Sequence, residues 1–421
     1  MKLSFTAFPF LILAFSACST LVVSTEQREI KTYENQDLAN NVGTVLLFPT
    51  NTEPSANPIS KIDEPLTLTF DLLGEDYQFL SAKIVHCNHD WKPSGLSDLE
   101  ILRVPNQFQI EDFQYSINTI QPYTIYTLQL PTVSISGNYA LVVYADNDEG
   151  NIIFTRRFVT FSNRVSLEAR INYSNVPNRR QSHHQVSFDL DYGSLTLFNP
   201  LAEIRTTILQ NHNWSKAIND LKPSSSRLDQ NFLSYSNYNG ENEFAAGNEL
   251  RFADARATQF RGLNVESVTR ARNGFEIRLE EDKLRSNIAY TNLFQDHNGQ
   301  FSIENQNPGQ DNLQADYINL HFTLASPSNL GQLFVEGKFN NWSPDSRHEM
   351  RYNDNLGRYE GQLFLKQGLY DYQYSLKTVL ENTIEGDFVQ TENDYEILVY
   401  YRNPKTNADE VIGYRLLSSG N

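Results

Sequence analysis

The feature that most constrains this chain is a period-two alternation of apolar and polar residues. Leu66, Leu68 and Phe70 alternate with threonines, so a strand formed there would bury one face and expose the other. Clusters of turn residues interrupt the alternation about every eight to twelve positions, a spacing typical of β-sandwiches. The sequence therefore predicts an all-β protein with little helix.

Two local elements follow from the same pattern. Residues 139–143 alternate and are followed by the turn sequence 146–150 and a second apolar run at 152–161, which predicts a β-hairpin. One short helix is expected at 214–221, because Pro223 would end it.

The length of 421 residues suggests about two or three domains at roughly 150 residues each. The tract 304–312 consists almost entirely of Asn, Gln, Pro, Gly and acidic residues, which is typical of a linker. We expect a signal peptide at 1–18, a polar tether at 19–41, a first β-sandwich at 42–164, a second at 165–303, a linker at 304–314 and a third sandwich at 315–417.

The first residues are typical of an export signal. Lys2 precedes an apolar run that ends in small residues before Cys18, and this run is shorter than the ~20 residues that span a bilayer. The sequence Phe-Ser-Ala-Cys at 15–18 is similar to a bacterial lipobox, with Phe15 where Leu is usual. Two alternatives stay open: lipidation of Cys18, or ordinary signal-peptidase cleavage nearby.

Charge and cysteine content exclude further classes. There are 34 Lys and Arg against 51 Asp and Glu, a net charge of −17, so phosphate backbones would repel the protein and nucleic-acid binding is not expected. An aromatic content of 12% is too high for a disordered chain. Once the leader is removed Cys87 is the only cysteine, so no intrachain disulfide is expected.

The heptad at 85–91, Val-His-Cys-Asn-His-Asp-Trp, is the most tempting candidate for a metal or catalytic site. Cys87 and His89 would share one strand face, but a structural zinc site needs four ligands and no second cysteine is available. A catalytic pair would lack a third group that orients the imidazole. We interpret the heptad as a strand end and a turn, with Cys87 and Trp91 in the core, and predict no catalytic residues, no metal and no cofactor.

A series of segments along the chain resembles one known family. They are 84–94, 118–119 with 123–126, 136–139, 208–211 with Trp214, 221–223, 247–251, 385–388, 391–395, 398–402 and 412–414. In this order they are similar to the plug protein of the type IX secretion system of Bacteroidetes-type bacteria, over nearly the full mature length.

The resemblance implies three tandem immunoglobulin-like or early-set β-sandwiches and a non-enzymatic role. Members of this family act as a periplasmic plug: they dock on the periplasmic mouth of the giant outer-membrane β-barrel translocon and close it in the resting state. The expected location is the periplasm at the inner face of the outer membrane. Membrane contact is expected only through the partner or an acyl anchor on Cys18.

The third predicted sandwich offers an alternative function. The segments 337–343 and 368–374 resemble the early-set sandwich of glycogen-binding modules, in which the Trp of the first motif stacks on sugar. Gln373 stands where that family has a basic residue, and 377–380 lacks the second aromatic residue. The alternative is therefore a periplasmic or surface glycan-binding lipoprotein that uses Trp342.

Overall fold

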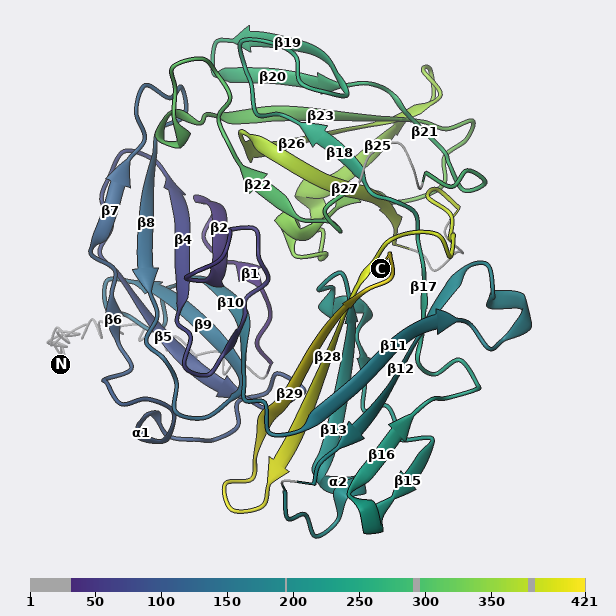
Figure 1. The fold of residues 1–421 in the computed structure, drawn as a ribbon. Coiled ribbons are helices and arrows are strands. Elements are labelled where there is room, and N and C mark those ends of the chain that lie inside the picture. The colour runs from purple at the N-terminus through teal and green to yellow at the C-terminus, as the bar shows by residue number, and fades with distance from the viewer. Residues whose placement is uncertain (1–31, 194, 291–295, 378–382, 421) are drawn as a thin grey trace, which may run out of the picture. The chain divides into compact units, whose positions relative to one another are not determined.

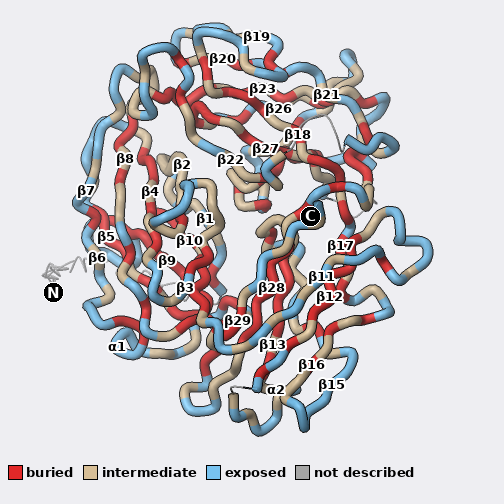
Figure 2. Tube along the Cα trace, viewed as in Figure 1, coloured by how far each residue is buried: buried red, intermediate tan, exposed pale blue. Residues whose placement is uncertain are grey.

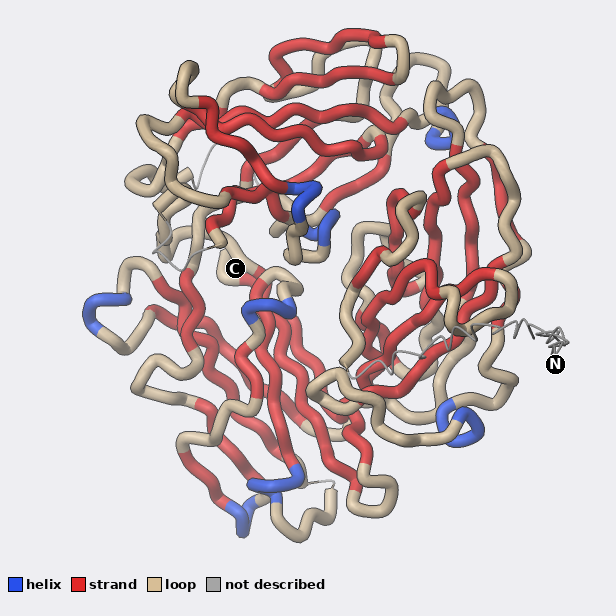
Figure 3. Tube along the Cα trace, turned by 180° about the vertical axis from the view of Figure 1, so that it is seen from behind, coloured by secondary structure: helices blue, strands red, loops and turns tan. Residues whose placement is uncertain are grey.

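The computed structural model describes residues 32–420 except 194, 291–295 and 378–382. The predicted leader, Cys18 and most of the predicted tether lie outside the described residues. Strands dominate, and the helices are short single turns (Figure 3), so the all-β prediction is confirmed. The helical turns are α1 (Asp98–Ile101), α2 (Pro200–Glu203), η1 (Pro177–Arg179), η2 (Trp214–Lys216), η3 (Leu228–Gln230), η4 (Asn312–Gln314), η5 (Lys338–Asn340) and η6 (Ser346–His348). Over these described ranges, no helix has the length and apolarity to cross a membrane.

The first sandwich packs two sheets around one core (Figure 1). One sheet has the order β1-β10-β9-β5-β6 with β3 beside β10, and the other has the order β2-β4-β8-β7. The predicted hairpin is confirmed, because β9 and β10 pair antiparallel. The strands are β1 (Gln36–Asp37), β2 (Val42–Pro49), β3 (Ile59–Lys61), β4 (Leu66–Leu73), β5 (Leu80–Cys87), β6 (Phe108–Gln109), β7 (Asp112–Tyr115), β8 (Tyr123–Gln129), β9 (Gly137–Ala145) and β10 (Ile152–Phe161).

The second sandwich has one sheet in the order β11-β12-β16-β15, with β17 beside β12, and another in the order β14-β13-β28-β29. The helix predicted at 214–221 is wrong: the turn η2 occupies its start, and β14 follows and pairs with β13. The strands are β11 (Ser166–Tyr173), β12 (His183–Asp191), β13 (Ile204–Gln210), β14 (Ile218–Asn219), β15 (Ser225–Arg227), β16 (Phe232–Tyr235), β17 (Glu243–Ala245), β28 (Asp394–Asn403) and β29 (Ala408–Ser418).

The remaining strands form one ten-stranded sheet in the order β18-β27-β24-β25-β26-β23-β20-β19, with β21 beside β23 and β22 beside β27. We call this sheet and its core the third sandwich. Its strands surround one apolar core. They are β18 (Arg251–Asp254), β19 (Val265–Ala271), β20 (Gly274–Leu279), β21 (Asp282–Lys283), β22 (Phe301–Ile303), β23 (Tyr317–Ala325), β24 (Leu333–Glu336), β25 (Glu349–Asn353), β26 (Arg358–Lys366) and β27 (Gly368–Leu376).

The strand pairing crosses the sandwich ranges expected from the sequence. β28 and β29 fall in the range 315–417 but pair with β13 of the second sandwich. β18 to β22 fall in the range 165–303 but join β23 and β27 of the third. The reason is that an alternating pattern identifies a strand but does not identify the strand with which it pairs. The division of the chain into domains at these three ranges stays a prediction. In the structure, the strands of the second and third sandwiches are interleaved in sequence.

Two segments expected to be loose are held by hydrogen bonds. In the predicted tether, Tyr33 is buried and its backbone N–H donates to the carbonyl of Trp91 at 3.0 Å, while β1 pairs with β10. In the predicted linker, Asn305 and Asn307 are 8% and 4% exposed, and the amide of Asn307 donates to Thr258 Oγ1 at 2.9 Å. Uncharged amides both donate and accept, so such a tract can be buried once its groups are paired.

Buried residues follow the strands, and exposed residues gather in the connecting loops (Figure 2). The cores of the three sandwiches are separate apolar clusters, yet contacts between the sandwiches join residues 31–421 into one unit. Polar side chains make many of these contacts, and they define the candidate site.

Candidate functional site

The heptad 85–91 is a strand end followed by a turn, as predicted. β5 ends at Cys87, and the backbone N–H of Trp91, in the left-handed region with a φ of 62°, donates to the carbonyl of Asn88 at 2.9 Å. Cys87 and Trp91 are buried. Burial raises the pKa of the Cys87 thiol to about 12, which keeps it protonated and unreactive. Within the described ranges, no group of three or more His, Cys, Asp or Glu side chains could hold a metal ion.

His89 connects the first sandwich to the second. Its backbone N–H and its Nδ1 lie 3.0 and 3.1 Å from Asp409 Oδ2, and its Nε2 lies 3.3 Å from Asp220 Oδ2. Asp409 is fully buried and also accepts from Arg402 Nη2 at 2.9 Å. Burial acts to raise the pKa of Asp409, but the hydrogen bonds from His89 and the charge of Arg402 outweigh it and hold that pKa below its ordinary value.

A second buried bond crosses the same joint, because Tyr400 Oη donates to Asn138 Oδ1 at 3.0 Å. Neither the metal hypothesis nor the catalytic hypothesis for the heptad anticipated these contacts of His89. Its partners are about 130 and 320 positions away along the chain, so no local spacing could have identified them.

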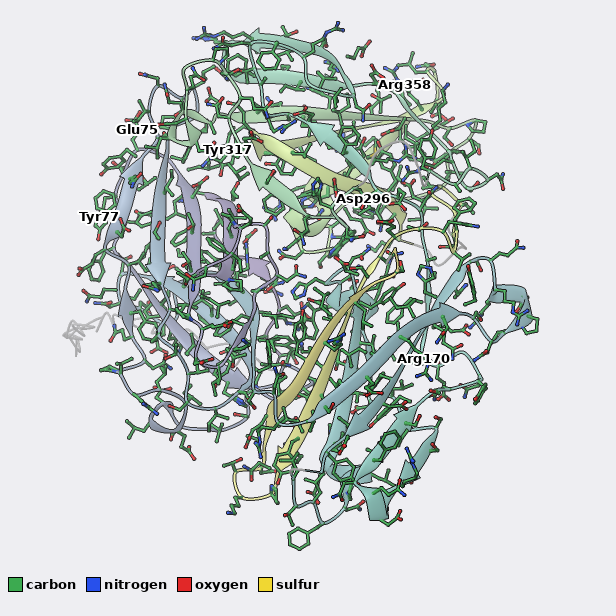
Figure 4. The ribbon with its side chains drawn as sticks, in the orientation of Figure 1. Glu75, Tyr77, Arg170, Asp296, Tyr317 and Arg358 are labelled. Carbon is green, nitrogen blue, oxygen red and sulfur yellow. The ribbon has the colours of Figure 1, made fainter. Side chains whose placement is uncertain are left out.

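Tyr317 occupies the joint between the first and third sandwiches (Figure 4). Its hydroxyl donates to Asp71 Oδ2 at 2.7 Å and accepts from the backbone N–H of Thr44 at 2.8 Å. Asp71 also binds Lys366 Nζ. The neighbouring Asp316 carboxylate accepts from the backbone N–H of Ile120 at 2.7 Å. Desolvated pairs of this kind fix one relative orientation, because a shift would leave charges buried and unpaired.

A group of carboxylates lies where the third sandwich leads into the second. Glu249 Oε1 accepts from the backbone N–H of Glu392 at 2.9 Å, and Asp371 Oδ2 accepts from His297 N–H at 2.6 Å. Asp296, labelled in Figure 4, accepts from the backbone N–H of Leu250, the residue after Glu249. Burial, with the added repulsion of Asp296, raises the pKa of Glu249 and of Asp371 to about 7. The joint therefore holds acidic groups that titrate near neutral pH.

The three tryptophans of the chain meet at one cavity of about 540 Å³. Trp91, Trp214 and Trp342 come from the first, second and third sandwich in turn. The rings of Trp91 and Trp214 meet edge to face with centroids 4.7 Å apart, a favourable aromatic geometry. Lys338 and Arg157 also line this cavity.

Trp342, the residue of the glycan-binding alternative, is 6% exposed. Its ring lies so close to Gly299 that a Cβ added there would be 2.1 Å from Cζ2. A sugar could not stack on this ring without moving it, because an aromatic platform needs an open face. Cys18, the candidate lipidation site, lies outside the described residues, so its lipidation stays a prediction.

Comparisons with known proteins agree with the resemblance found in the sequence. Residues 42–162 match the family model described as the type 9 secretion system plug protein 1st domain. Among solved structures, the chain is similar to a hypothetical protein from Parabacteroides merdae ATCC 43184, with 31% identity and a TM-score of 0.85. The alignment covers 92% of this chain and 99% of that one. No curated protein matches the chain.

Proposed function

Because the chain belongs to the type 9 secretion system plug protein family, we propose that it docks on the periplasmic mouth of the outer-membrane β-barrel translocon of that system and closes it in the resting state. The observation that carries this proposal is the match of residues 42–162 to the plug family. The proposed role is mechanical and uses no catalytic residue. The proposed location is the periplasm, at the inner face of the outer membrane.

A protein that closes a translocon has to keep its shape, and the buried polar contacts between the sandwiches of this chain support that requirement. His89 with Asp409 and Tyr317 with Asp71 tie the first sandwich to both of the others. Breaking the Tyr317–Asp71 joint would leave Asp71 buried without Tyr317 and Lys366, and an unpaired buried charge typically costs about 3–5 kcal/mol. Asp409 would keep Arg402 but lose its hydrogen bonds from His89. The three sandwiches should therefore resist displacement as one body.

The expected dimensions are also compatible. A barrel of about 36 strands, spaced ~4.8 Å apart and tilted ~40°, has a diameter of very roughly 70 Å. A compact chain of this length is on the order of 55 Å wide. A single small sandwich would be too narrow for that opening, whereas several sandwiches joined together could obstruct it. A mean hydropathy of −0.49 fits a polar contact that can be released.

The test is co-purification with the translocon. The mature chain, carrying a C-terminal affinity tag and expressed at its native level, is isolated from detergent-solubilised outer membranes, and the retained proteins are identified by mass spectrometry. We expect a very large β-barrel protein to be retained. An unrelated tagged β-sandwich protein exported to the same compartment is the control. Recovery of soluble periplasmic proteins alone would contradict the proposal.

A second measurement addresses closure rather than docking. Deletion of the gene should make the outer membrane permeable to large antibiotics that it normally excludes, and expression of the wild-type chain should restore resistance. Docking without any change in permeability would identify a translocon partner that does not close it.

A further inference from the structure

The cavity bordered by the three tryptophans has the features of a binding site. Its volume of about 540 Å³ is within the range typical of ligand pockets, about 300–1,000 Å³. Trp91, Trp214 and Trp342 reach it from three different sandwiches. Trp91 and Trp342 are buried and Trp214 is half-buried, so the three rings form part of the cavity wall and offer no open stacking face.

Two cations on the cavity wall donate to backbone carbonyls, and in the described part of the chain the carboxylates that act on them, Glu396 on Lys338 and Glu34 on Arg157, form no ion pair with them. Lys338 Nζ donates to the backbone carbonyl of Ser55 at 2.5 Å, and Arg157 Nε donates to the carbonyl of Tyr33 at 2.7 Å. The Arg157 guanidinium also lies over the Trp91 ring, 4.4 Å from its centroid. Over residues 32–420, apart from the undescribed gaps, neither cation has a carboxylate oxygen within ion-pair distance.

Burial of these two cations changes their pKa values. Burial lowers the pKa of Lys338 to about 8 and that of Arg157 to about 10. A partly buried cation without a counterion is costly, and an anion entering the cavity would offset that cost with charge-assisted hydrogen bonds. Glu34, Asp90 and Asp220 also line the cavity, but Asp90 pairs with Lys92, Asp220 pairs with Arg205, and Glu34 accepts a hydrogen bond from Gln36. Lys338 and Arg157 are therefore the groups of the wall that favour a negatively charged occupant.

An edge strand on the same wall indicates what kind of molecule carries the charge. Val45, Leu46 and Leu47 of β2 line the cavity. β2 pairs with β4 on one side and, in the part of the chain that the structure describes, with no strand on the other. The outward backbone N–H and C=O groups of such an edge can pair with an extended peptide.

We propose that this cavity binds an extended peptide segment that carries a carboxylate, with the carboxylate at Lys338 and Arg157 and the backbone along β2. The carboxylate could belong to an acidic side chain or to a peptide C-terminus, which present the same chemistry. The site goes beyond the docking function proposed above, and it can be tested with purified protein and synthetic peptides alone.

The test uses the tryptophans themselves as reporters, because all three of the chain border the cavity. Three N-acetylated tripeptides without aromatic residues are titrated into the purified chain. One has a central glutamate and one has glutamine in its place, both amidated at the C-terminus, and the third is of glycine with a free C-terminal carboxylate. We expect a saturable change in tryptophan fluorescence with at least one of the carboxylate peptides and none with the glutamine peptide. The carboxylate peptide that binds shows whether the carboxylate belongs to an acidic side chain or to a peptide C-terminus.

Variants test the position of the charge. Lys338→Met should weaken binding at least tenfold, whereas Lys338→Arg should stay within about threefold of the wild type because it keeps the cation. Lys61→Met is the matched control: Lys61 is exposed, pairs with exposed Glu64, and neither residue lines the cavity, so the peptide affinity of this variant should change less than twofold. The proposal is overturned if neither carboxylate peptide binds, if the glutamine peptide binds as well, or if a folded Lys338→Met variant binds like the wild type. The peptide comparison on the wild type decides the matter should Lys338→Met fail to fold.

Discussion

Lys366 Nζ lies 2.8 Å from Asp71 Oδ2, and the two buried side chains come from different sandwiches. Desolvation lowers the pKa of Lys366 and raises that of Asp71, so the pair is expensive to bury. Tyr317 donates a further hydrogen bond to the same carboxylate, and the Lys366 ammonium lies over the Tyr123 ring, 4.1 Å from its centroid. The joint therefore depends on both charges being present.

Removing one charge of this pair should be more harmful than removing both. Lys366→Met is expected to lower the free energy of unfolding by about 3–5 kcal/mol, because Asp71 would be left buried without its partner. The double variant Lys366→Met with Asp71→Leu should recover part of this loss. Urea unfolding of both single variants and the double variant measures the coupling.

An exposed ion pair in the first sandwich provides the control for that cycle. Lys61 and Glu64 are 3.5 Å apart and half exposed, so Lys61→Met should change the free energy of unfolding by less than about 1 kcal/mol. If Lys366→Met cost no more than Lys61→Met, the buried pair would not hold the joint.

Gly43 should be sensitive to the smallest added side chain. A Cβ at Gly43 would lie 2.2 Å from Tyr317 Oη, so Gly43→Ala should displace the hydroxyl that binds Asp71 and cost about 1–3 kcal/mol. Tyr317→Phe removes that oxygen, and its cost should therefore be smaller in the Gly43→Ala background than in the wild type. Thermal and urea unfolding of the two single variants and the double variant test this.

Gly150→Ala is the control, since it lies in an exposed turn where the nearest atom is the end of the Asp148 side chain at 3.1 Å. It should change stability by less than about 0.5 kcal/mol. Simple additivity of Gly43→Ala and Tyr317→Phe would show that the hydroxyl and the added methyl group do not interfere.

His86 should make the fold sensitive to acid. It is 2% exposed, and burial lowers its pKa to about 4, below the ordinary value of 6.5. The unfolded chain therefore binds the proton more readily than the folded one, and the contribution of His86, complete above pH 6.5, is lost as the pH falls towards 4. The loss should be on the order of 2–3 kcal/mol. Urea unfolding between pH 7 and pH 4 measures it.

His86→Phe separates this effect from that of the acidic residues. The difference in unfolding free energy between wild type and variant should shrink with falling pH, because the variant has no imidazole to protonate. A difference that stays constant between pH 7 and pH 4 would mean that His86 is protonated in the folded protein as easily as in the unfolded one.

Glu249 should make the free energy of unfolding depend on pH in the opposite direction. Its pKa is raised to about 7 from 4.5, so its stabilising contribution is present below pH 4.5 and is lost as the pH rises towards 7. Glu249→Gln keeps an oxygen that can accept from Glu392 N–H and removes the charge. We expect Glu249→Gln to gain about 1–2 kcal/mol relative to the wild type between pH 5 and pH 8, measured by urea unfolding at the two values.

Glu100→Gln is the comparison for that experiment. Glu100 is exposed, and hydrogen bonds from Ser97 hold its pKa below the ordinary value. It is already ionised at both pH values, so its substitution should not change the difference in stability between them. A Glu249→Gln variant with the same pH response as the wild type would contradict a raised pKa in the folded protein.

Features that depend on neighbours along the chain were predicted well from the sequence. The alternation at Leu66 to Phe70 identified β4, the turn at 146–150 identified the β9–β10 hairpin, and the heptad was correctly interpreted as a strand end. The features that were predicted wrongly depend on contacts between residues that are not neighbours in the sequence. The helix expected at 214–221 gave way to a turn and β14, and Asn307 of the predicted linker is buried against Thr258.

The sequence by itself determined the all-β class, the positions of β4, β9 and β10, and the resemblance to the plug family, because alternation, turn residues and ordered motifs are local properties of the chain. Only the tertiary structure decided that β28 and β29 complete the second sandwich and that His89 meets Asp409. The tertiary structure also decided that three distant tryptophans share one cavity. The physical reason is that a strand's pattern specifies which face is buried but not which edge it pairs with. That choice depends on the closure of long loops and on buried charges finding partners hundreds of residues away.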